Sequence, residues 1–366
     1  MVDVALGKSR LVAQGLVTRP WANPRDAVAA HGAMQGQDLP GALASVALRT
    51  TGSIGDVLDA LNDASLVRGY PMRGTVFLMA ADDLLWVSEL CNAAPMRAAV
   101  KRRAQLELTD SMVETASARA QEVLADKPAG LSRAELFETW AATGMPTDQG
   151  RGYHVLAHLI GRGELVYGPW NGADQNVVAT SRWLPADSTL VARFNGDAVA
   201  ATAELLRRYL TSHGPATLRD FAWWTKLPLR QISAAFAQVA DELEAAAGTS
   251  VTDLDAQRWR PGLPDEVAAL GRNPTKPLLL PGFDEFILGY QDRLFAMTAE
   301  QHQQLVPGNN GVFAKSAVNA GRVVCLWKRG GRPGKRTLDL VEFEPLAAGV
   351  RNRFEALFRA FPVVAE

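Results

Sequence analysis

The sequence predicts an α+β fold that is mainly helical and repeats one supersecondary pattern three times. The pattern is three amphipathic helical segments followed by two short strands, and its copies share periodicity rather than sequence identity. After Pro261 the residue pattern changes, because prolines and extended apolar runs replace the helical periodicity. Three helices followed by a hairpin form a winged helix-turn-helix. We therefore expect three tandem winged helix-turn-helix modules and a small strand-rich C-terminal unit.

The first module is assigned to residues 1–125. Pro24 opens a helix over 24–30, a second helix covers 39–48, and Ser53 caps a third that runs to residue 61. Residues 66–79 then read as two short strands around a turn.

The second and third copies follow the same order. Helices are expected at 112–124, 132–142 and 149–161, with a wing at 164–180; the linker 126–130 sets the module at 126–190. The third module, 191–265, has helices at 197–212, from Thr217 and at 228–243, with a wing at 249–259. Thr217 followed by Asp220 is a capping-box signature.

The last unit is assigned to residues 266–366. Strands are expected at 310–314, 321–328 and 335–343. The final helix, within 344–363, carries Phe354, Leu357 and Phe358 on one face.

Composition indicates a globular protein. Of the 366 residues 48% are hydrophobic and 21% are charged, and no run of about eighteen apolar residues occurs. The N-terminus lacks a signal-like apolar segment, so we expect a cytoplasmic protein. We also expect it to be a monomer. Cys91 and Cys325 lie among apolar neighbours, which suits reduced core thiols.

Two primary amides, Gln35 and Gln37, stand just before a helix for which Asp38 is the natural N-cap. In an extended segment, residues two apart point to the same side, so both amides could meet one small ligand. Alternatively, the glutamines tie down loop backbone. Asp38 is either the cap or a catalytic carboxylate.

The segment 34–50 resembles the glutamine-x-glutamine motif of the AlkZ-like DNA glycosylases, a winged-helix family of bacterial alkylation-repair and self-resistance enzymes. Segments 214–224 and 280–293 are also similar to that family, so the resemblance spans nearly the whole chain. Gly36 departs from it, because relatives carry alanine or a larger aliphatic residue there. The resemblance implies that Gln35 and Gln37 are catalytic.

The chemistry of an amide suits the reaction that the resemblance implies. Glutamine has no useful pKa and is no conventional general base, but it can orient a water. Such weak catalysis suffices when the leaving group is already good, as in a purine made cationic by alkylation. We expect a monofunctional DNA glycosylase that acts on N7-alkylguanine, N3-alkyladenine and bulky or cross-linked adducts in double-stranded DNA.

Candidate phosphate contacts are clustered basic residues in a chain whose formal net charge is −1. Each cluster binds the DNA backbone or is only a solvated face. The candidates lie on the first wing, in a run near residue 100, and in a glycine-rich segment near the C-terminus: Arg68, Arg73, Arg97, Lys101, Arg102, Arg103, Lys328, Arg329, Arg332, Lys335 and Arg336.

Several other sites are not indicated. His154 and His158 share a helix face, but no nearby ligand completes a metal site, and no glycine pattern fits a nucleotide cofactor. The Trp223–Trp224 pair and the adjacent Asp284 and Glu285 are assigned to packing, although paired carboxylates beside an apolar run could form a site.

A second function class stays open: a non-catalytic DNA-binding regulator or architectural protein built from the same winged helices. Every feature except the paired glutamines fits both.

Overall fold

A computed structural model describes residues 2–309, 311–332 and 334–364. The chain forms two compact units. The first contains residues 1–57 and 203–366, and the second contains residues 58–202. Within the described part of the chain, no helix combines the length and the apolar character needed to cross a membrane.

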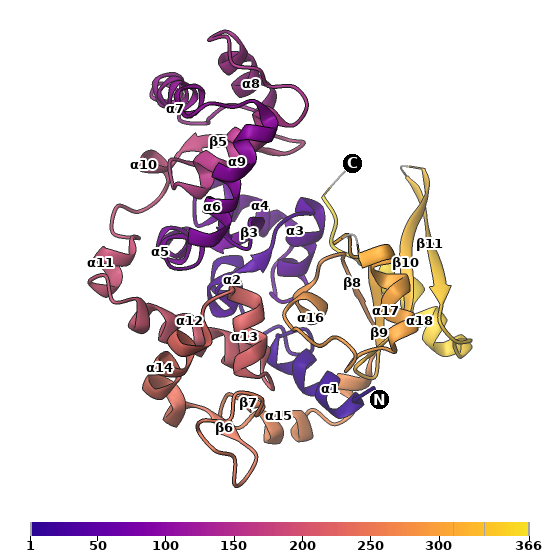
Figure 1. The fold of residues 1–366 in the computed structure, drawn as a ribbon. Helices are drawn as coiled ribbons and strands as arrows, with labels where there is room; N and C mark the ends of the chain where they lie inside the picture. Colours follow the sequence, from indigo (N-terminus) through magenta and orange to yellow (C-terminus); the bar gives the residue numbers. More distant parts are fainter. Residues whose placement is uncertain (1, 310, 333, 365–366) are drawn as a thin grey trace. The chain divides into compact units, whose positions relative to one another are not determined.

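The chain passes from one unit to the other twice, once within α4 (Ile54–Asn62) and once within α12 (Ala198–His213) (Figure 1). The first unit otherwise contains α1 (Val4–Ala13), α2 (Pro24–His31), β1 (Met34–Gln35), α3 (Leu39–Ala47), α13 (Leu218–Thr225), α14 (Leu229–Val239), β6 (Glu244–Ala245), β7 (Arg258–Trp259), α15 (Leu263–Ala269), β8 (Leu278–Leu280), α16 (Glu285–Leu288), α17 (Ala299–Leu305), β9 (Ser316–Asn319), β10 (Arg322–Arg332), β11 (Lys335–Glu342) and α18 (Ala348–Arg359).

The second unit contains β2 (Leu66–Met72), β3 (Thr75–Ala80), α5 (Ala81–Cys91), α6 (Ala93–Arg102), α7 (Asp110–Leu124), α8 (Arg133–Ala141), α9 (Arg151–Gly161), β4 (Leu165–Trp170), β5 (Gln175–Ala179), α10 (Thr180–Trp183) and α11 (Leu190–Phe194). The order α7, α8, α9, β4, β5 is three helices and a hairpin, as expected for the second copy. The three-module arrangement and its boundaries stay a prediction.

Helix starts follow the capping residues of the sequence. The Asn23 side chain accepts a hydrogen bond from the backbone N–H of Asp26, and Pro24 opens α2. Thr217 and Asp220 form the reciprocal bonds of a capping box at α13, as predicted. The fold is thus α+β and mainly helical, as the periodicity predicts.

Two expected strands differ. Residues 311–314 are irregular, and the neighbouring strand is β9; the first residue of the expected strand, Asn310, lies outside the described residues. The third wing is reduced to β6 and β7, of two residues each, because turns fill most of the polar segment between them.

In the second unit, β3, β2, β4 and β5 lie in that order as antiparallel neighbours. The turn between β2 and β3 places Arg73 and Gly74 at φ values of 57° and 67°. A core that includes Trp140, Leu156 and Val177, all fully buried, joins α7, α8 and α9 to the sheet. This unit therefore has its own hydrophobic core.

In the first unit, the C-terminal sheet has the order β11–β10–β9–β8 and is antiparallel (orange to yellow in Figure 1). Trp327 of β10 is buried, donates its indole N–H to the carbonyl oxygen of Leu280 at 2.9 Å, and packs with Phe354 of α18. The predicted apolar face of the last helix is thus the face that covers this sheet. Cys91 and Cys325 are free and buried, as predicted.

Candidate active site

The two glutamines lie in the short connection between α2 and α3. Gln35 ends β1 and is only 4% exposed, whereas Gln37 lies in an exposed bend. The two amides therefore differ in exposure, and their meeting one ligand stays a prediction. Asp38 occupies the N-cap position of α3, but its side chain makes no capping hydrogen bond.

The side chain of Gln35 folds back onto its own loop. Its Oε1 accepts hydrogen bonds from the backbone N–H of Gly36 at 2.8 Å and of Gln37 at 3.2 Å. This is the backbone-tying role that the sequence left as an alternative. The Gln35 amide oxygen is therefore occupied, and its bonds set the conformation from which Gln37 projects.

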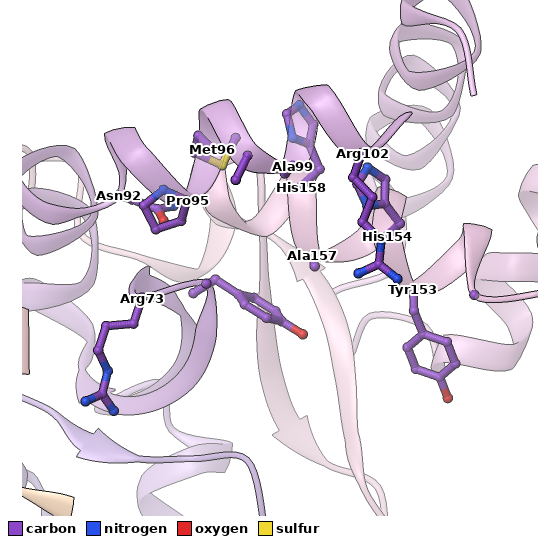
Figure 2. A pocket seen from close by; sticks show the side chains of 14 residues that line it. Arg73, Asn92, Pro95, Met96, Ala99, Arg102, Tyr153, His154, Ala157 and His158 are labelled. Atoms are coloured by element: carbon purple, nitrogen blue, oxygen red, sulfur yellow. The ribbon is translucent and has the colours of Figure 1, made fainter. Parts of the chain in front are cut away.

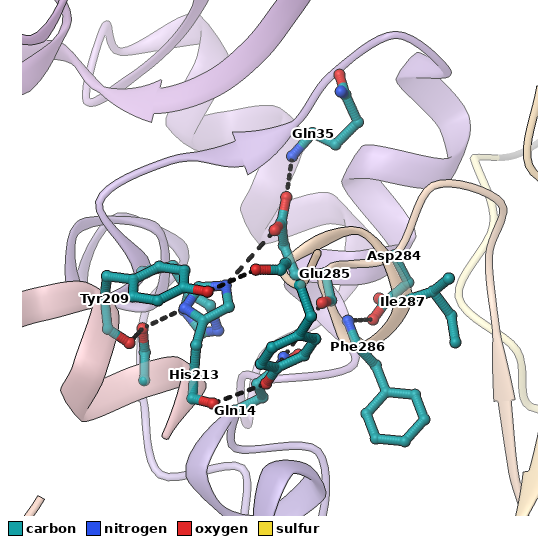
Figure 3. A network of polar contacts seen from close by, with 12 residues as sticks. Gln14, Gln35, Tyr209, His213, Asp284, Glu285, Phe286 and Ile287 are labelled. Atoms are coloured by element: carbon teal, nitrogen blue, oxygen red, sulfur yellow. Dashed lines mark hydrogen bonds and ion pairs between the residues drawn. The ribbon is translucent and has the colours of Figure 1, made fainter. Parts of the chain in front are cut away.

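Glu285 holds the same loop from the other side (Figure 3). Its Oε1 accepts the backbone N–H of Gln35 at 2.8 Å, and its Oε2 lies 3.5 Å from Nε2 of His213. Both side chains are fully buried. The His213 ring stacks on Tyr209 with centroids 4.5 Å apart, and its Nδ1 lies 2.9 Å from Oγ of Ser212. The motif loop is thus anchored by the buried Glu285 carboxylate, which contacts the His213 ring that stacks on Tyr209.

The neighbouring Asp284 faces a different partner. Its two carboxylate oxygens accept hydrogen bonds from Nη1 and Nη2 of Arg49 at 2.8 and 2.9 Å, and Ser45 donates a third bond. Burial acts to raise the pKa of Asp284, but the charge and hydrogen bonds of Arg49 and Ser45 outweigh it and lower that pKa. This buried fork ties α16 to the end of α3.

Gln14 joins the two carboxylate systems. Its Nε2 donates to the backbone oxygen of Glu285 at 3.2 Å and to Oη of Tyr290 at 3.0 Å, while its Oε1 accepts from Arg49 at 2.7 Å. Tyr290 in turn donates to the backbone oxygen of His213 at 2.8 Å. Four separate segments of the first unit therefore converge behind the motif loop.

Charged side chains also flank the motif at its exposed end. The Asp38 carboxylate lies over Gly41, since a Cβ on that glycine would stand 2.6 Å from Oδ2. Lys315 is half-buried, and its pKa is lowered by burial and by the charge of Arg329, against the opposing charge of Asp38. Gln37, Asp38 and Lys315 thus bring an amide, a carboxylate and an amine to one neighbourhood.

Five of the predicted DNA contacts lie on the β10–β11 hairpin. Lys328 pairs in register with Asp339, and Arg329 pairs with Leu338. At the tip Arg332 faces Lys335, and both are exposed. Together with Arg336, Arg332 and Lys335 make the tip of this hairpin basic.

The other predicted contacts belong to the second unit, and two of them are turned inward. Arg68 is buried, 3.6 Å from Oδ1 of Asp174, and its guanidinium lies over the Tyr167 ring. Arg103 is buried, pairs with Asp110 at 2.5 Å and contacts Nε2 of His158. These two arginines serve internal pairs, which sequence clustering could not distinguish from surface positions.

The remaining basic candidates of this unit are more accessible. Arg97, Lys101 and Arg102 are exposed on α6, and Arg73 is partly exposed at the β2–β3 turn.

The residues that the sequence assigned to packing differ in how deeply they are buried. Trp224 is fully buried, but the half-buried Trp223 ring carries the cationic groups of Lys226 and Arg293 at 5.1 and 4.9 Å from its centroid. Within the described residues, no group of three or more His, Cys, Asp or Glu side chains is placed to hold a metal ion. The role of Glu285 in anchoring the motif had one sequence signal, its pairing with Asp284 beside an apolar run. His213 and Lys315 had none.

The order α7, α8, α9, β4, β5 is that of a winged helix, an arrangement that DNA-binding proteins use. The profile described as DNA glycosylase AlkZ-like matches residues 28–361. The chain therefore belongs to the AlkZ-like DNA glycosylase family, as the motif resemblance indicated. Membership implies a DNA substrate.

Two comparisons with proteins of Streptomyces sahachiroi agree with this assignment. A relative named interstrand DNA cross-link repair glycosylase is 25% identical over 287 residues, which cover 73% of this chain and 71% of the relative. The solved structure of the DNA glycosylase AlkZ has a TM-score of 0.72, covers 100% of this chain and 98% of its own, and is 22% identical. The structural likeness shows the shared fold.

Proposed function

We propose that this protein is a monofunctional DNA glycosylase that releases cationic alkylated purines, including bulky or cross-linked ones, by attack of a water that Gln37 positions. The supporting observation is the exposed Gln37 amide on a loop that Gln35 and Glu285 hold rigidly from behind. The relative's name, an interstrand cross-link repair enzyme, supports the bulky end of this substrate range.

The two glutamines have different roles in this proposal. The Oε1 of Gln35 already accepts two backbone N–H groups, so Gln35 is a positioning residue. The amide of Gln37 projects from the exposed bend, so its carbonyl oxygen can accept a hydrogen bond from water while its amino group donates to a neighbouring oxygen. A fixed loop reduces the entropy that this water must lose before it attacks.

The chemistry requires little acid or base catalysis. The bond between C1′ and the purine nitrogen breaks, and its electron pair neutralises the positive charge on the leaving base. The water oxygen then bonds to C1′ and releases a proton to solvent. The carboxylate of Asp38 is adjacent to Gln37 and makes no capping bond, so in this proposal it stabilises the positive charge that develops on the sugar.

The test is incubation of the whole protein with duplex DNA that carries N7-methylguanine, followed by alkaline cleavage and gel analysis. We expect strand breaks at the modified guanine and none in matched undamaged duplex. A regulator or architectural protein would bind DNA without producing abasic sites.

A second arm separates the enzyme from the regulator by what it binds. Selection from a random pool of undamaged duplexes should enrich no consensus, because a lesion enzyme held by phosphates and shape has little sequence preference. A tight consensus together with no base release would replace the enzyme with the regulator.

A further inference from the structure

The second unit contains a pocket of about 500 Å³ that the glycosylase proposal does not use. It lies beneath α6, beside the β2–β3 turn and against α9, and Figure 2 shows the side chains that line it. This volume is in the ordinary range for a small-molecule site.

The lining of this pocket combines apolar surface with positive charge. Pro95, Met96 and Ala157 supply apolar surface, and Arg102 brings a guanidinium group to one end of the pocket. Arg73 lines the opposite end, where its guanidinium lies over the Phe77 ring. No carboxylate is among the described lining residues. A neighbouring hollow differs, because Asp148 and Asp174 line it. The first pocket therefore favours an anion with an apolar body.

Tyr153 provides an oriented aromatic surface between the two hollows. The residue is 53% exposed and lines both of them. Phe137 packs edge-on to it at 5.2 Å between centroids, and the Arg133 guanidinium lies 5.4 Å from the ring centroid. A fixed, exposed ring is a suitable platform for stacking a planar ligand.

The positive charge of the pocket is insensitive to pH near neutrality. Burial and the charges of Arg102 and Arg103 lower the pKa of His154, and burial with Arg103 lowers the pKa of His158 to about 4. Both shifts favour the neutral imidazole, so the positive charge of the lining comes from its arginines.

We propose that this pocket binds a nucleoside 5′-phosphate, with the base stacked on Tyr153 and the phosphate held by Arg102. Guanidinium forks match phosphate oxygens, and every base offers a face to an aromatic ring. The nucleotide is either free or an unpaired residue of a DNA strand. The proposal is independent of the glutamine chemistry, because its residues belong to the other unit.

The experiment titrates the full chain with dAMP, deoxyadenosine and inorganic phosphate by calorimetry at pH 7.5, and with a fluorescent single-stranded oligonucleotide. We expect saturable dAMP binding that is stronger than binding of either half-ligand. Saturation by dAMP alone identifies a free nucleotide as the ligand, and saturation by the oligonucleotide identifies an unpaired residue of a strand. Absence of saturation by both would overturn the proposal.

Variants locate the binding. Arg102→Gln and Tyr153→Ala change exposed side chains, so both should fold and weaken binding on the order of tenfold each. Ala157→Phe should block the pocket without changing charge. Lys127→Gln, which removes an exposed charge of the same unit outside the pocket, is the control. Equal weakening by Lys127→Gln and Arg102→Gln would show diffuse electrostatic attraction and refute the site. Gln37→Ala should leave nucleotide binding unchanged even if the glycosylase proposal fails.

Discussion

At the scale of single residues, the two glutamines divide the work that the motif suggested they share. A buried amide with an occupied oxygen shapes the loop, and an exposed amide faces solvent. This division accompanies the hydrogen bonds that the Gln35 oxygen accepts from the backbone N–H groups of Gly36 and Gln37.

Replacing Gln37 with alanine should lower the single-turnover excision rate about ten- to a hundredfold or more, because the water loses its orienting partner. DNA affinity and thermal stability should stay nearly unchanged, since the side chain is exposed. Excision kinetics on N7-methylguanine duplex would measure this, with Gln303→Ala, another exposed glutamine of the first unit, as the control. An undiminished rate for the double alanine variant of Gln35 and Gln37 would remove the catalytic role from the motif.

The Arg49–Asp284 pair carries a different prediction, because both side chains are buried. Arg49→Met leaves the Asp284 carboxylate without its charged partner, so the free energy of unfolding should fall by about 3–5 kcal/mol. Urea denaturation measures the change. Arg219→Met removes the exposed pair with Asp255 and should cost less than about 1 kcal/mol. Similar costs for the two variants would mean that the buried fork has no special role in stability.

At the scale of elements, the β10–β11 hairpin brings basic residues from both strands to one tip. Arg332 and Lys335 are cross-strand partners there, so their charges act together although the net charge of the chain is −1. At α6 the pattern differs, because Arg103, which directly follows the helix, is buried and pairs with the exposed Asp110, while Arg97 and Lys101 stay exposed.

If the hairpin grips the DNA backbone, the double variant Arg332→Gln/Lys335→Gln should reduce the slope of log affinity against log salt by about two. Lesion preference should not change, since phosphate contacts carry no base information. Fluorescence anisotropy across a salt series measures the slope. Arg272→Gln/Lys276→Gln removes two exposed charges elsewhere in the first unit and should leave the slope intact. An unaltered slope in the hairpin variant would identify its tip as a solvated face.

At the scale of the whole molecule, buried histidines link stability to pH. Burial, the Arg49 charge and the nearby His213 ring hold the pKa of His31 well below its usual value. The unfolded chain takes up a proton at His31 near pH 6.5, whereas the folded chain does not. The stability that this histidine supports is therefore present above about pH 6.5 and declines as the pH falls.

The free energy of unfolding should accordingly fall on acidification, with His31 contributing about 1.4 kcal/mol per pH unit below pH 6.5. His31→Gln can still donate to the carbonyl oxygen of Ala27, which the imidazole Nδ1 contacts at 2.8 Å, but cannot titrate. Urea unfolding at pH 7.5, 6.5 and 5.5 should show a shallower pH dependence for the variant. Parallel curves for variant and wild type would exclude His31 as a source of the acid sensitivity.

The sequence by itself determined the helical elements, the capping box at Thr217, the β2–β3 and β4–β5 hairpins and the family motif around Gln35, because periodicity and capping are local properties of the chain. Only the tertiary structure decided what the clustered and paired residues do. It turned Arg68 and Arg103 inward and set Glu285, some 250 positions further along the chain, against the backbone of Gln35. Burial and ion-pair choice depend on segments distant in sequence, which no local pattern of residues encodes.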